Sequence, residues 1–352
     1  MNLQELGHDP VQVAQAARLV YMSDTMPGIS RQRAGDQFRY VDAKGNPVDD
    51  ETTLARIRSM ALPPVWESVW ISAKVNGHLQ ATGIDTKNRK QYRYHAKWNA
   101  IRSETKFFRM AAFGEALPKL RARLSKDLKI RSLSREKVIA IALSVMEQTL
   151  IRVGNAAYEK EYGSYGLTTL KDRHMKLEGD EARFSFKGKK GIYHDITLHD
   201  QRLSKLVKAC RDLPGKELFQ YIDEQGNRHP IDSGMVNDYL RETMGEDFSA
   251  KDFRTWAGTV NALRLLADLE PCETEKELKK NVNTILDEVS HQLGNTRTVC
   301  RKHYVHPQLL EAYECQDLNP YFKQKARFRQ TSPYGLDGIE KLLLRFLKDR
   351  VK

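Results

Sequence analysis

The sequence contains little cysteine, and its cysteines are not spaced to bind a metal or to form a disulfide framework. The four cysteines stand at positions 210, 272, 300 and 315, and no two of them form a C-x-x-C pair. Neither a zinc site nor a small disulfide-rich fold is therefore indicated. This usage is typical of a reducing compartment, so we expect a cytoplasmic protein.

Long hydrophobic runs are missing as well. The longest apolar stretch, Val138 to Met146, is far shorter than the roughly 20 residues that a helix needs to cross a bilayer. The first residues, Met1 to Pro10, are polar and do not resemble a signal peptide. We therefore expect no association with a membrane.

Motifs for nucleotides and catalytic metals are absent too. The chain has no G-x-x-x-x-G-K-[ST] loop for ATP, no H-E-x-x-H pair, and no tight group of Asp and Glu that could hold two metal ions. His303 and His306 come nearest to a metal-binding pair. Any chemistry that this chain performs is therefore expected to need no metal, no nucleotide and no other cofactor.

Positive charge, in contrast, is abundant and locally concentrated. Lys and Arg together number 58 against 46 Asp and Glu, which gives a net charge of +12. A basic stretch between Thr86 and Arg109 holds one acid, Glu104, and interleaves cations with aromatic residues: Lys87, Arg89, Lys90, Tyr92, Arg93, Tyr94, Lys97, Trp98, Arg102, Lys106, Phe107, Phe108 and Arg109. Cations neutralise phosphates, and aromatic side chains can meet bases, so this stretch favours a nucleic-acid partner.

The 352 residues are enough for roughly two domains. Residues 1–100 form the expected first domain, which is rich in strands at Val69 to Ala73 and Gln91 to His95. A short helix is expected from Thr52 to Met60, before Pro63-Pro64. The boundary is placed between residues 98 and 104, and residues 101–352 form the second domain.

The second domain is predicted to be mainly helical, with a strand-rich insert. Ser134 is suited to cap a helix whose apolar residues run from Val138 to Leu150, and Gly154 is expected to interrupt or end it. Short alternating patterns then predict strands at residues 167–170, 174–177, 182–187 and 192–198, with Lys189 at a Gly-rich hairpin tip.

A second helix is predicted late in the chain. Leu278, Val282, Ile285, Val289 and Leu293 recur at spacings that place them on one helical face, and Gly294 ends that helix. A new helix is expected to start near Thr296, to stop before Pro307 and to carry Tyr304. A closing helix is expected over residues 339–347.

Five polar residues form a candidate active site: Arg152, Lys189, Arg254, Asn295 and Tyr304. Each alone has an ordinary structural explanation, such as a surface arginine or, for Asn295, a helix N-cap. Together they match the needs of phosphodiester cleavage. Arginine forks hold phosphate oxygens, a lysine can protonate a leaving oxygen, and a tyrosine can store the bond energy in a covalent phosphodiester.

The order and setting of these residues resemble the type IB DNA topoisomerases of the small poxvirus-like, bacterial kind. The resemblance covers most of the chain. It rests on Arg152-Val153-Gly154 followed by Tyr158, on Gly166 to Lys171, on Phe186 to Lys189, on Lys251 to Thr255, on Gly294 to Tyr304 and, in the first domain, on Asp85 to Tyr94. It implies an α+β fold, in which a small strand-rich domain and a larger, mainly helical catalytic domain with a small antiparallel sheet close as a clamp around duplex DNA.

The resemblance also implies a role for each site residue. Tyr304 is the nucleophile that forms a 3′-phosphotyrosyl bond, Arg152 and Arg254 hold the scissile phosphate, and Lys189 protonates the leaving 5′ oxygen. Asn295 stands where poxvirus relatives carry a histidine, and its amide can donate a hydrogen bond but cannot be cationic. The DNA-contacting positions that the resemblance implies are Lys87, Arg89, Gln91, Tyr92, Tyr94 and Tyr158. The expected enzyme is a monomer that relaxes supercoiled DNA of either sign in the nucleoid.

Three alternatives stay open at this point. A tyrosine recombinase shares the mechanism, but it usually has a histidine where this chain has Lys251, and Gly-His where this chain has Gly294-Asn295. A DNA-binding protein with an inert tyrosine would bind without forming a covalent adduct. An RNA-binding protein fits the charge, but no RNA-binding motif is evident.

Overall fold

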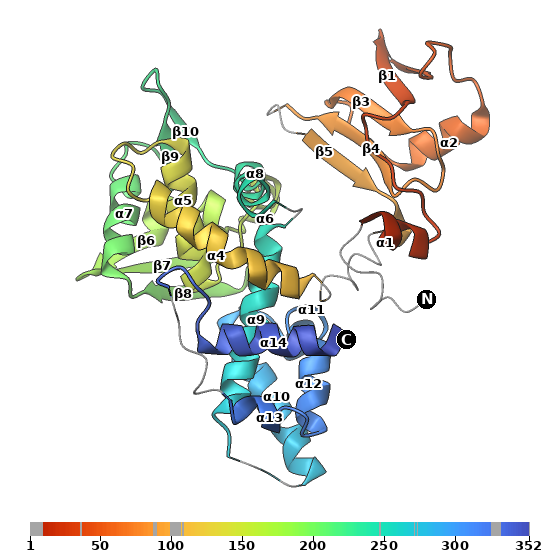
Figure 1. Cartoon of the computed structure of the whole chain (residues 1–352). Coiled ribbons are helices and arrows are strands. Elements are labelled where there is room, and N and C mark those ends of the chain that lie inside the picture. Colours follow the sequence, from red (N-terminus) through yellow and green to blue (C-terminus); the bar gives the residue numbers. More distant parts are fainter. Residues whose placement is uncertain are drawn as a thin grey trace. The chain divides into compact units, whose positions relative to one another are not determined.

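The computed structural model describes residues 10–35, 37–86, 90–98, 107, 109–245, 248–270, 272, 274–324 and 332–351. The chain divides into two compact units, Met1–Arg109 and Met110–Arg350. Both units combine helices with antiparallel sheets, so the fold is α+β (Figure 1).

The first unit is built on a five-stranded antiparallel sheet with the strand order β2-β1-β3-β4-β5 (Figure 1). Its elements are α1 (Pro10–Ala16), β1 (Gly28–Ala34), β2 (Gln37–Val41), α2 (Glu51–Ser59), β3 (Glu67–Ser72), β4 (Leu79–Ile84) and β5 (Lys90–Tyr94). Val69 and Ile71 alternate along β3 and pack with Ile57 of α2, so the helix covers one face of the sheet. The predicted helix and both predicted strands of this region are confirmed.

The second unit holds most of the helices. Its elements are α4 (Met110–Asp127), α5 (Arg135–Thr149), α6 (Ala156–Tyr162), η1 (Leu167–Thr169), η2 (Asp172–His174), β6 (Met175–Glu178), β7 (Glu181–Lys187), η3 (Lys189–Gly191), β8 (Tyr193–Leu198), α7 (Gln201–Arg211), β9 (Gln220–Ile222), β10 (Arg228–Pro230), α8 (Ser233–Met244), α9 (Ala250–Ala267), α10 (Glu275–Gln292), α11 (Arg297–His303), α12 (Pro307–Glu314), α13 (Asn319–Phe322) and α14 (Gly338–Val351). Within the described ranges, no helix combines the length and the apolar character needed to cross a membrane.

Helix α5 lies in the core of this unit. Every residue from Val138 to Leu143 is buried, so the helix is apolar on all sides, as a central helix must be. Ser134 caps its start by accepting a hydrogen bond from the Lys137 N–H, as predicted. The end was predicted wrongly: the helix stops at Leu150, whose backbone is left-handed, and not at Gly154.

The strand-rich insert forms a three-stranded antiparallel sheet with the order β6-β7-β8. Three of the four predicted strands are confirmed. The fourth, at residues 167–170, is wrong, because Leu167–Thr169 forms a single 3-10 turn. The backbone N–H groups of Leu167 and Thr168 are held instead by the carbonyls of Arg152 and Val153, at 2.7 and 2.8 Å.

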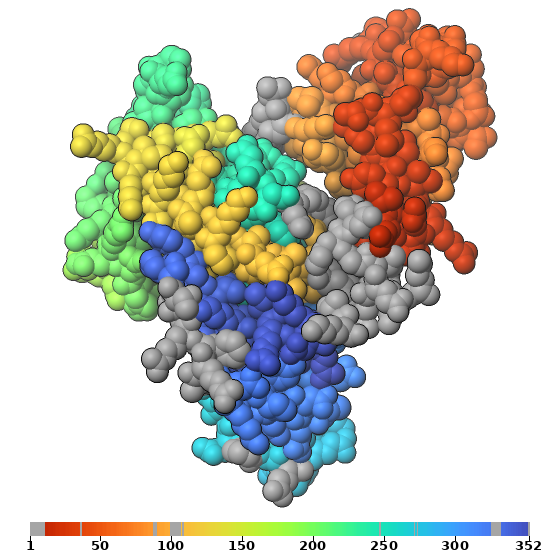
Figure 2. Space-filling model, in the orientation of Figure 1, coloured from red at the N-terminus to blue at the C-terminus, as the bar shows by residue number. Residues whose placement is uncertain are grey.

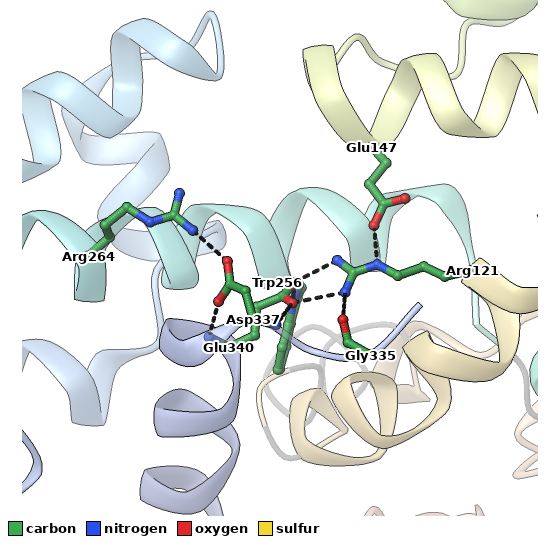
Figure 3. Close-up of polar contacts among 7 residues, drawn as sticks. All are labelled: Arg121, Glu147, Trp256, Arg264, Gly335, Asp337 and Glu340. Atoms are coloured by element: carbon green, nitrogen blue, oxygen red, sulfur yellow. Dashed lines mark hydrogen bonds and ion pairs between the residues drawn. The ribbon is translucent and has the colours of Figure 1, made fainter. Parts of the chain in front are cut away.

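A network of polar contacts holds the closing helix α14 in place (Figure 3). The buried carboxylate of Glu340 accepts two hydrogen bonds from Arg121 of α4, at 2.8 and 2.9 Å, and one from the Trp256 indole of α9, at 3.2 Å. Arg121 also bonds to Glu147 of α5 at 2.7 Å. Glu340 and Asp337 each accept a bond from the backbone N–H of the other, which caps the start of α14.

The same region is tightly packed. In Figure 2 the dark-blue closing helix fills the space beside the yellow residues of α4, and Lys348 pairs with Glu115 across this contact at 2.5 Å. A Cβ atom on Gly114 of α4 would lie 2.4 Å from the Trp256 ring, so only glycine fits there. Helix α9, which carries Trp256 and Arg254, is therefore held by α14 through the Glu340 bond and by α4 through the packing of Gly114.

Candidate active site

Arg254 is the most deeply buried of the candidate residues, with 4% of its surface exposed. It lies in the second turn of α9, whose start is capped by Asp252 through bonds from the Ser249 N–H and hydroxyl. Its guanidinium donates to the carbonyl of Leu150, at the end of α5, and to that of Leu293, at the end of α10, the latter at 2.6 Å. The last carbonyls of two helices thus fix one cation.

This position is costly for a charge. Burial, helped by the nearby charge of Arg152, lowers the pKa of Arg254 to about 10. Among the described residues its Nε atom finds no hydrogen-bond partner. The side chain is still positively charged at neutral pH. A buried, incompletely paired arginine is more favourable when an anion is beside it, which is what a phosphate would supply.

The turn after α10 places Asn295. Gly294 is left-handed, with φ +55°, and its N–H bonds to the carbonyl of His291, while the Asn295 N–H bonds to that of Ser290. These two bonds form a Schellman motif, with Asn295 two residues beyond the helix cap Leu293. The expected N-cap role of Asn295 is therefore wrong: Thr296 caps α11 by accepting from the Val299 N–H.

Arg152 approaches the same turn from the segment after α5. One of its terminal nitrogens donates to the Gly294 carbonyl at 3.1 Å and to Oδ1 of Asn295 at 2.7 Å. The backbone of this segment passes close to a later one, because a Cβ on Gly166 would lie 2.6 Å from the Gly154 Cα. Because both residues are glycines, the two backbone segments can approach, and the Leu167 N–H donates to the Arg152 carbonyl at 2.7 Å. This bond holds the backbone of Arg152 in place.

Tyr304 is the cap residue that follows α11, so its expected place within a helix is wrong by one position. Its N–H bonds to Cys300 and its carbonyl accepts from the Thr259 hydroxyl of α9 at 3.2 Å. The guanidinium of Arg254 lies 5.2 Å from the centre of its ring. Burial alone would raise the pKa of Tyr304, but the charges of Arg254 and Arg152 outweigh it and lower the pKa below its usual value.

Lys189 lies in the turn η3 between β7 and β8, as predicted, and it is exposed. It lines a cavity of about 660 Å³ together with Arg152 and Tyr158. The structure thus brings Arg152, Arg254, Asn295 and Tyr304 together around one turn, and it places Lys189 in a cavity that Arg152 also borders.

His194 was missed by the sequence analysis. It faces Phe186 across the β7–β8 hairpin, with the two rings stacked at 5.1 Å. Burial and the charges of Arg152 and Arg254 lower its pKa to about 4, so it is neutral at pH 7. The available signal was a histidine five residues after Lys189, on the returning strand of the predicted hairpin.

The predicted DNA-contacting residues are placed unevenly. Lys87 and Arg89 lie outside the described residues. On the edge strand β5, Tyr92 and Tyr94 share one face with parallel rings 6.1 Å apart, whereas Gln91 points to the other face and bonds to Asp85 at 3.0 Å.

Tyr158 lies on α6 in the second unit. Its side chain is 54% exposed, and its ring is 5.9 Å from that of Tyr162, which is equally exposed. Both rings line the same cavity as Lys189 and Arg152.

Metal-binding groups are not found in the part of the chain that the structure describes: no three residues of the types His, Cys, Asp and Glu cluster as metal ligands would. The ring of His306, one half of the nearest candidate pair, accepts from the Gln308 N–H at 3.2 Å and so caps α12.

This geometry suits attack on a phosphodiester. A phenol whose pKa is lowered lies beside a fixed, buried guanidinium, and a second guanidinium and an amide meet at the adjacent turn. These groups can stabilise a negatively charged transition state without moving. A nearby exposed lysine can donate a proton.

Comparison with known proteins agrees with this description. Residues 95–331 match the family model of the eukaryotic DNA topoisomerase I catalytic core, and residues 37–85 match that of the bacterial DNA topoisomerase IB N-terminal domain. The chain is 32% identical over 296 residues to DNA topoisomerase 1B of Acanthamoeba polyphaga mimivirus, covering 82% of this chain and 88% of the relative. It is 24% identical to DNA topoisomerase 1B of vaccinia virus, covering 76% and 84%. The chain belongs to the type IB DNA topoisomerase family, whose members are isomerases.

Proposed function

We propose that this protein relaxes supercoiled duplex DNA by cutting and resealing one strand through Tyr304. The Tyr304 phenol gives up its proton to solvent and its oxygen attacks the phosphorus, so that the bond from phosphorus to the 5′ oxygen breaks and a 3′-phosphotyrosyl bond forms. The free 5′ end rotates about the intact strand. The 5′ hydroxyl then attacks the phosphotyrosine and releases Tyr304, so the bond energy is kept and no ATP is needed.

Two arginines stabilise the charge that builds up on the phosphate in this proposal. Arg254 is immobilised by two helix ends, and Arg152 is held against the Gly294–Asn295 turn. Their positions are fixed before DNA binds, so little reorganisation is needed in the transition state. Each guanidinium has further N–H groups that can turn to phosphate oxygens.

Asn295 and Lys189 complete the site. The Asn295 amide presents its oxygen to Arg152 and its nitrogen to the Leu293 carbonyl at 3.2 Å, so it orients Arg152 and can offer an N–H to a phosphate oxygen. Lys189 donates the proton that the departing 5′ oxygen requires.

The mode of DNA binding is part of the proposal. The two domains close as a clamp on the duplex, with Tyr92 and Tyr94 of β5 and the exposed Tyr158 of α6 meeting the DNA. The enzyme works as a monomer, without a metal or nucleotide, on nucleoid DNA in the cytoplasm. The excess of positive charge supports a polyanionic partner.

One observation carries the proposal: the Tyr304 ring lies 5.2 Å from a buried guanidinium, which lowers the pKa of the phenol. The test is relaxation of a supercoiled plasmid in EDTA without ATP, with the protein beside its Tyr304→Phe variant. We expect the parent to relax the plasmid and the variant to bind DNA without relaxing it. Tyr221→Phe, which removes a hydroxyl from β9, is the matched control and should behave as the parent. A Tyr304→Phe protein that still relaxes plasmid would refute the assignment.

A further inference from the structure

The imidazole of His194 fills the space between two segments that carry proposed site residues. One is the β7–β8 hairpin, where Gly188 immediately precedes Lys189. The other is the turn after α10, where Gly294 immediately precedes Asn295. The ring therefore touches the neighbours of two site residues that are 106 positions apart in the sequence.

Both contacts are so close that a Cβ atom on either glycine would force the imidazole to shift. A Cβ on Gly188 would lie 2.5 Å from the His194 Cδ2 atom, and a Cβ on Gly294 would lie 2.3 Å from its Cε1 atom. Gly188 has φ −93°, which any residue adopts, so its backbone does not explain the glycine. The contact with the imidazole does explain it. Gly294 needs glycine both for its left-handed backbone and for this contact.

The two remaining sides of the ring differ, because one is packed and the other is open. One face is stacked on the buried ring of Phe186, which fixes the tilt of the imidazole. Another side borders a cavity of about 850 Å³, which is also lined by Asn295. No group from the described part of the chain fills the space on that side, so the imidazole is the group that separates the hairpin from the turn.

The chemistry of the ring suits a spacer rather than an ion. Among the described residues, neither ring nitrogen of His194 has a hydrogen-bond partner. The ring is neutral at pH 7, because burial and the charges of Arg152 and Arg254 disfavour its protonated form. It therefore occupies this position without adding a further positive charge to the site.

We propose that His194 is a positioning residue: its imidazole sets the spacing between the hairpin that carries Lys189 and the turn that carries Asn295 and holds Arg152. The inference rests on the proposed function, since it concerns how Lys189 reaches the leaving oxygen. Proton transfer depends steeply on this placement, and a misplacement of about 1 Å can slow a reaction by about 10²-fold.

The experiment changes the contact from both sides. His194→Ala removes the ring, and Gly188→Ala adds a methyl group that the ring must yield to. His199→Ala is the matched control, because His199 follows the same strand but is exposed and pairs with Glu181. Each protein is mixed in excess with two DNA duplexes of one sequence, and the rate of covalent adduct formation is measured. In one duplex the bridging 5′ oxygen at the cleavage site is replaced by sulfur.

The sulfur duplex separates positioning of the proton donor from every other effect. A thiolate leaves without being protonated, so its departure does not need Lys189, whereas attack by Tyr304 and grip by the two arginines are still required. We expect His194→Ala and Gly188→Ala to cleave ordinary DNA about 10²-fold more slowly than the parent. On the sulfur duplex both should come within a few-fold of the parent, and His199→Ala should match the parent on both.

Two results would overturn the proposal. One is an equal loss on both duplexes, which would mean that the ring supports the phosphate grip or the fold instead. The other is an unchanged rate on ordinary DNA. Melting temperatures are recorded for each variant, and Gly188→Ala decides the matter if His194→Ala is unfolded. A parent protein that forms no adduct with either duplex would refute the proposed function itself, which keeps the two failures apart.

Discussion

The two arginines of the site should respond differently to replacement by alanine, although both serve the same chemistry in the proposed mechanism. Arg254 is enclosed and bonded to the ends of α5 and α10, whereas Arg152 is half-buried and reaches the turn from one side. We therefore expect both variants to lose cleavage and only Arg254→Ala to lose much stability.

The stability cost at Arg254 can be worked from its contacts. Two hydrogen bonds from a charged donor contribute about 3–6 kcal/mol together. Holding the charge where the pKa of Arg254 falls from 12.5 to about 10 costs about 3 kcal/mol, which the variant recovers. Removing the buried methylene chain of Arg254 loses about 2 kcal/mol or more of packing energy. The free energy of unfolding should therefore fall by about 3 kcal/mol, which lowers the Tm by about 6–12 °C for a unit of this size.

The corresponding cost at Arg152 is smaller. Its two bonds come from one nitrogen and lie where water can replace them, so the loss should be about 1 kcal/mol or less. The Tm should then fall by no more than about 4 °C. Covalent adduct formation should fall by about 10²–10³-fold or more in both variants, as for the loss of one electrostatic contact in a transition state.

The assay pairs calorimetric melting of each variant with the rate of adduct formation on labelled DNA, read from a denaturing gel. Adduct rates are measured well below the melting temperature, so that unfolding does not enter them. An Arg254→Ala variant with the same melting temperature as the parent would contradict the stability cost assigned to Arg254. An Arg152→Ala variant whose melting temperature falls as far as that of Arg254→Ala would contradict the difference between the two arginines.

Three further predictions follow from charges elsewhere in the second unit. Neighbouring cations, Lys251 among them, lower the pKa of Tyr304, so the cleavage rate should rise with pH and level off below the ordinary phenol value of about 10. Lys251→Gln should move this rise in rate to higher pH. A pH profile that Lys251→Gln leaves unchanged would contradict the prediction. The pKa of His194 is about 4 in the folded protein and 6.5 ordinarily, so the unfolded chain binds the proton first and the free energy of unfolding falls as the pH drops from 6.5 to 4. Denaturant titrations of His194→Ala should show a smaller fall in the free energy of unfolding over this pH range. An equal fall in the parent and the variant would contradict the prediction. Glu340→Gln leaves the half-buried Arg121 with only one of its two carboxylate partners, Glu147, and removes the charge of a buried carboxylate, which should cost about 3 kcal/mol. Glu51→Gln, at an exposed ion pair, should cost less than about 1 kcal/mol in the same titration. Equal effects would contradict the role of the network in Figure 3.

Local signals made much of the fold predictable. The apolar stripe of α10 and its stop at Gly294 could be read because each follows from residues a few positions apart. The Ser134 cap and the hairpin that carries Lys189 are local in the same sense. Such features need no knowledge of what packs against them.

Features set by distant contacts could not be predicted in this way. Helix α5 ends at Leu150 where the carbonyl meets Arg254, 104 residues later. The segment at Leu167–Thr169 has the alternation of a strand, but its N–H groups are taken by the backbone after α5. The contacts of His194 with two glycines needed the hairpin and the α10 turn to be placed in space.

The candidate site was predicted from residue type and order, whereas the contacts among its side chains could not be predicted in that way. Asn295 follows a Schellman turn where an N-cap was expected, because the next residue, Thr296, takes the cap. That shift leaves the Asn295 oxygen free to accept from Arg152. Which side chain meets which guanidinium depends on such one-residue differences, and composition carries no information about them.

Leu150 holds a left-handed backbone, φ 55°, that costs a leucine about 1–2 kcal/mol. The carbonyl that this conformation turns inward is the one that Arg254 grips, so the strain and the grip depend on each other. The last turn of α5, the end of α10 and the cation should consequently order and melt as one cooperative unit. A partly folded state with the left-handed Leu150 but without the Arg254 hydrogen bond would keep the backbone strain and lose the bond that offsets it. Such states should therefore be little populated during folding.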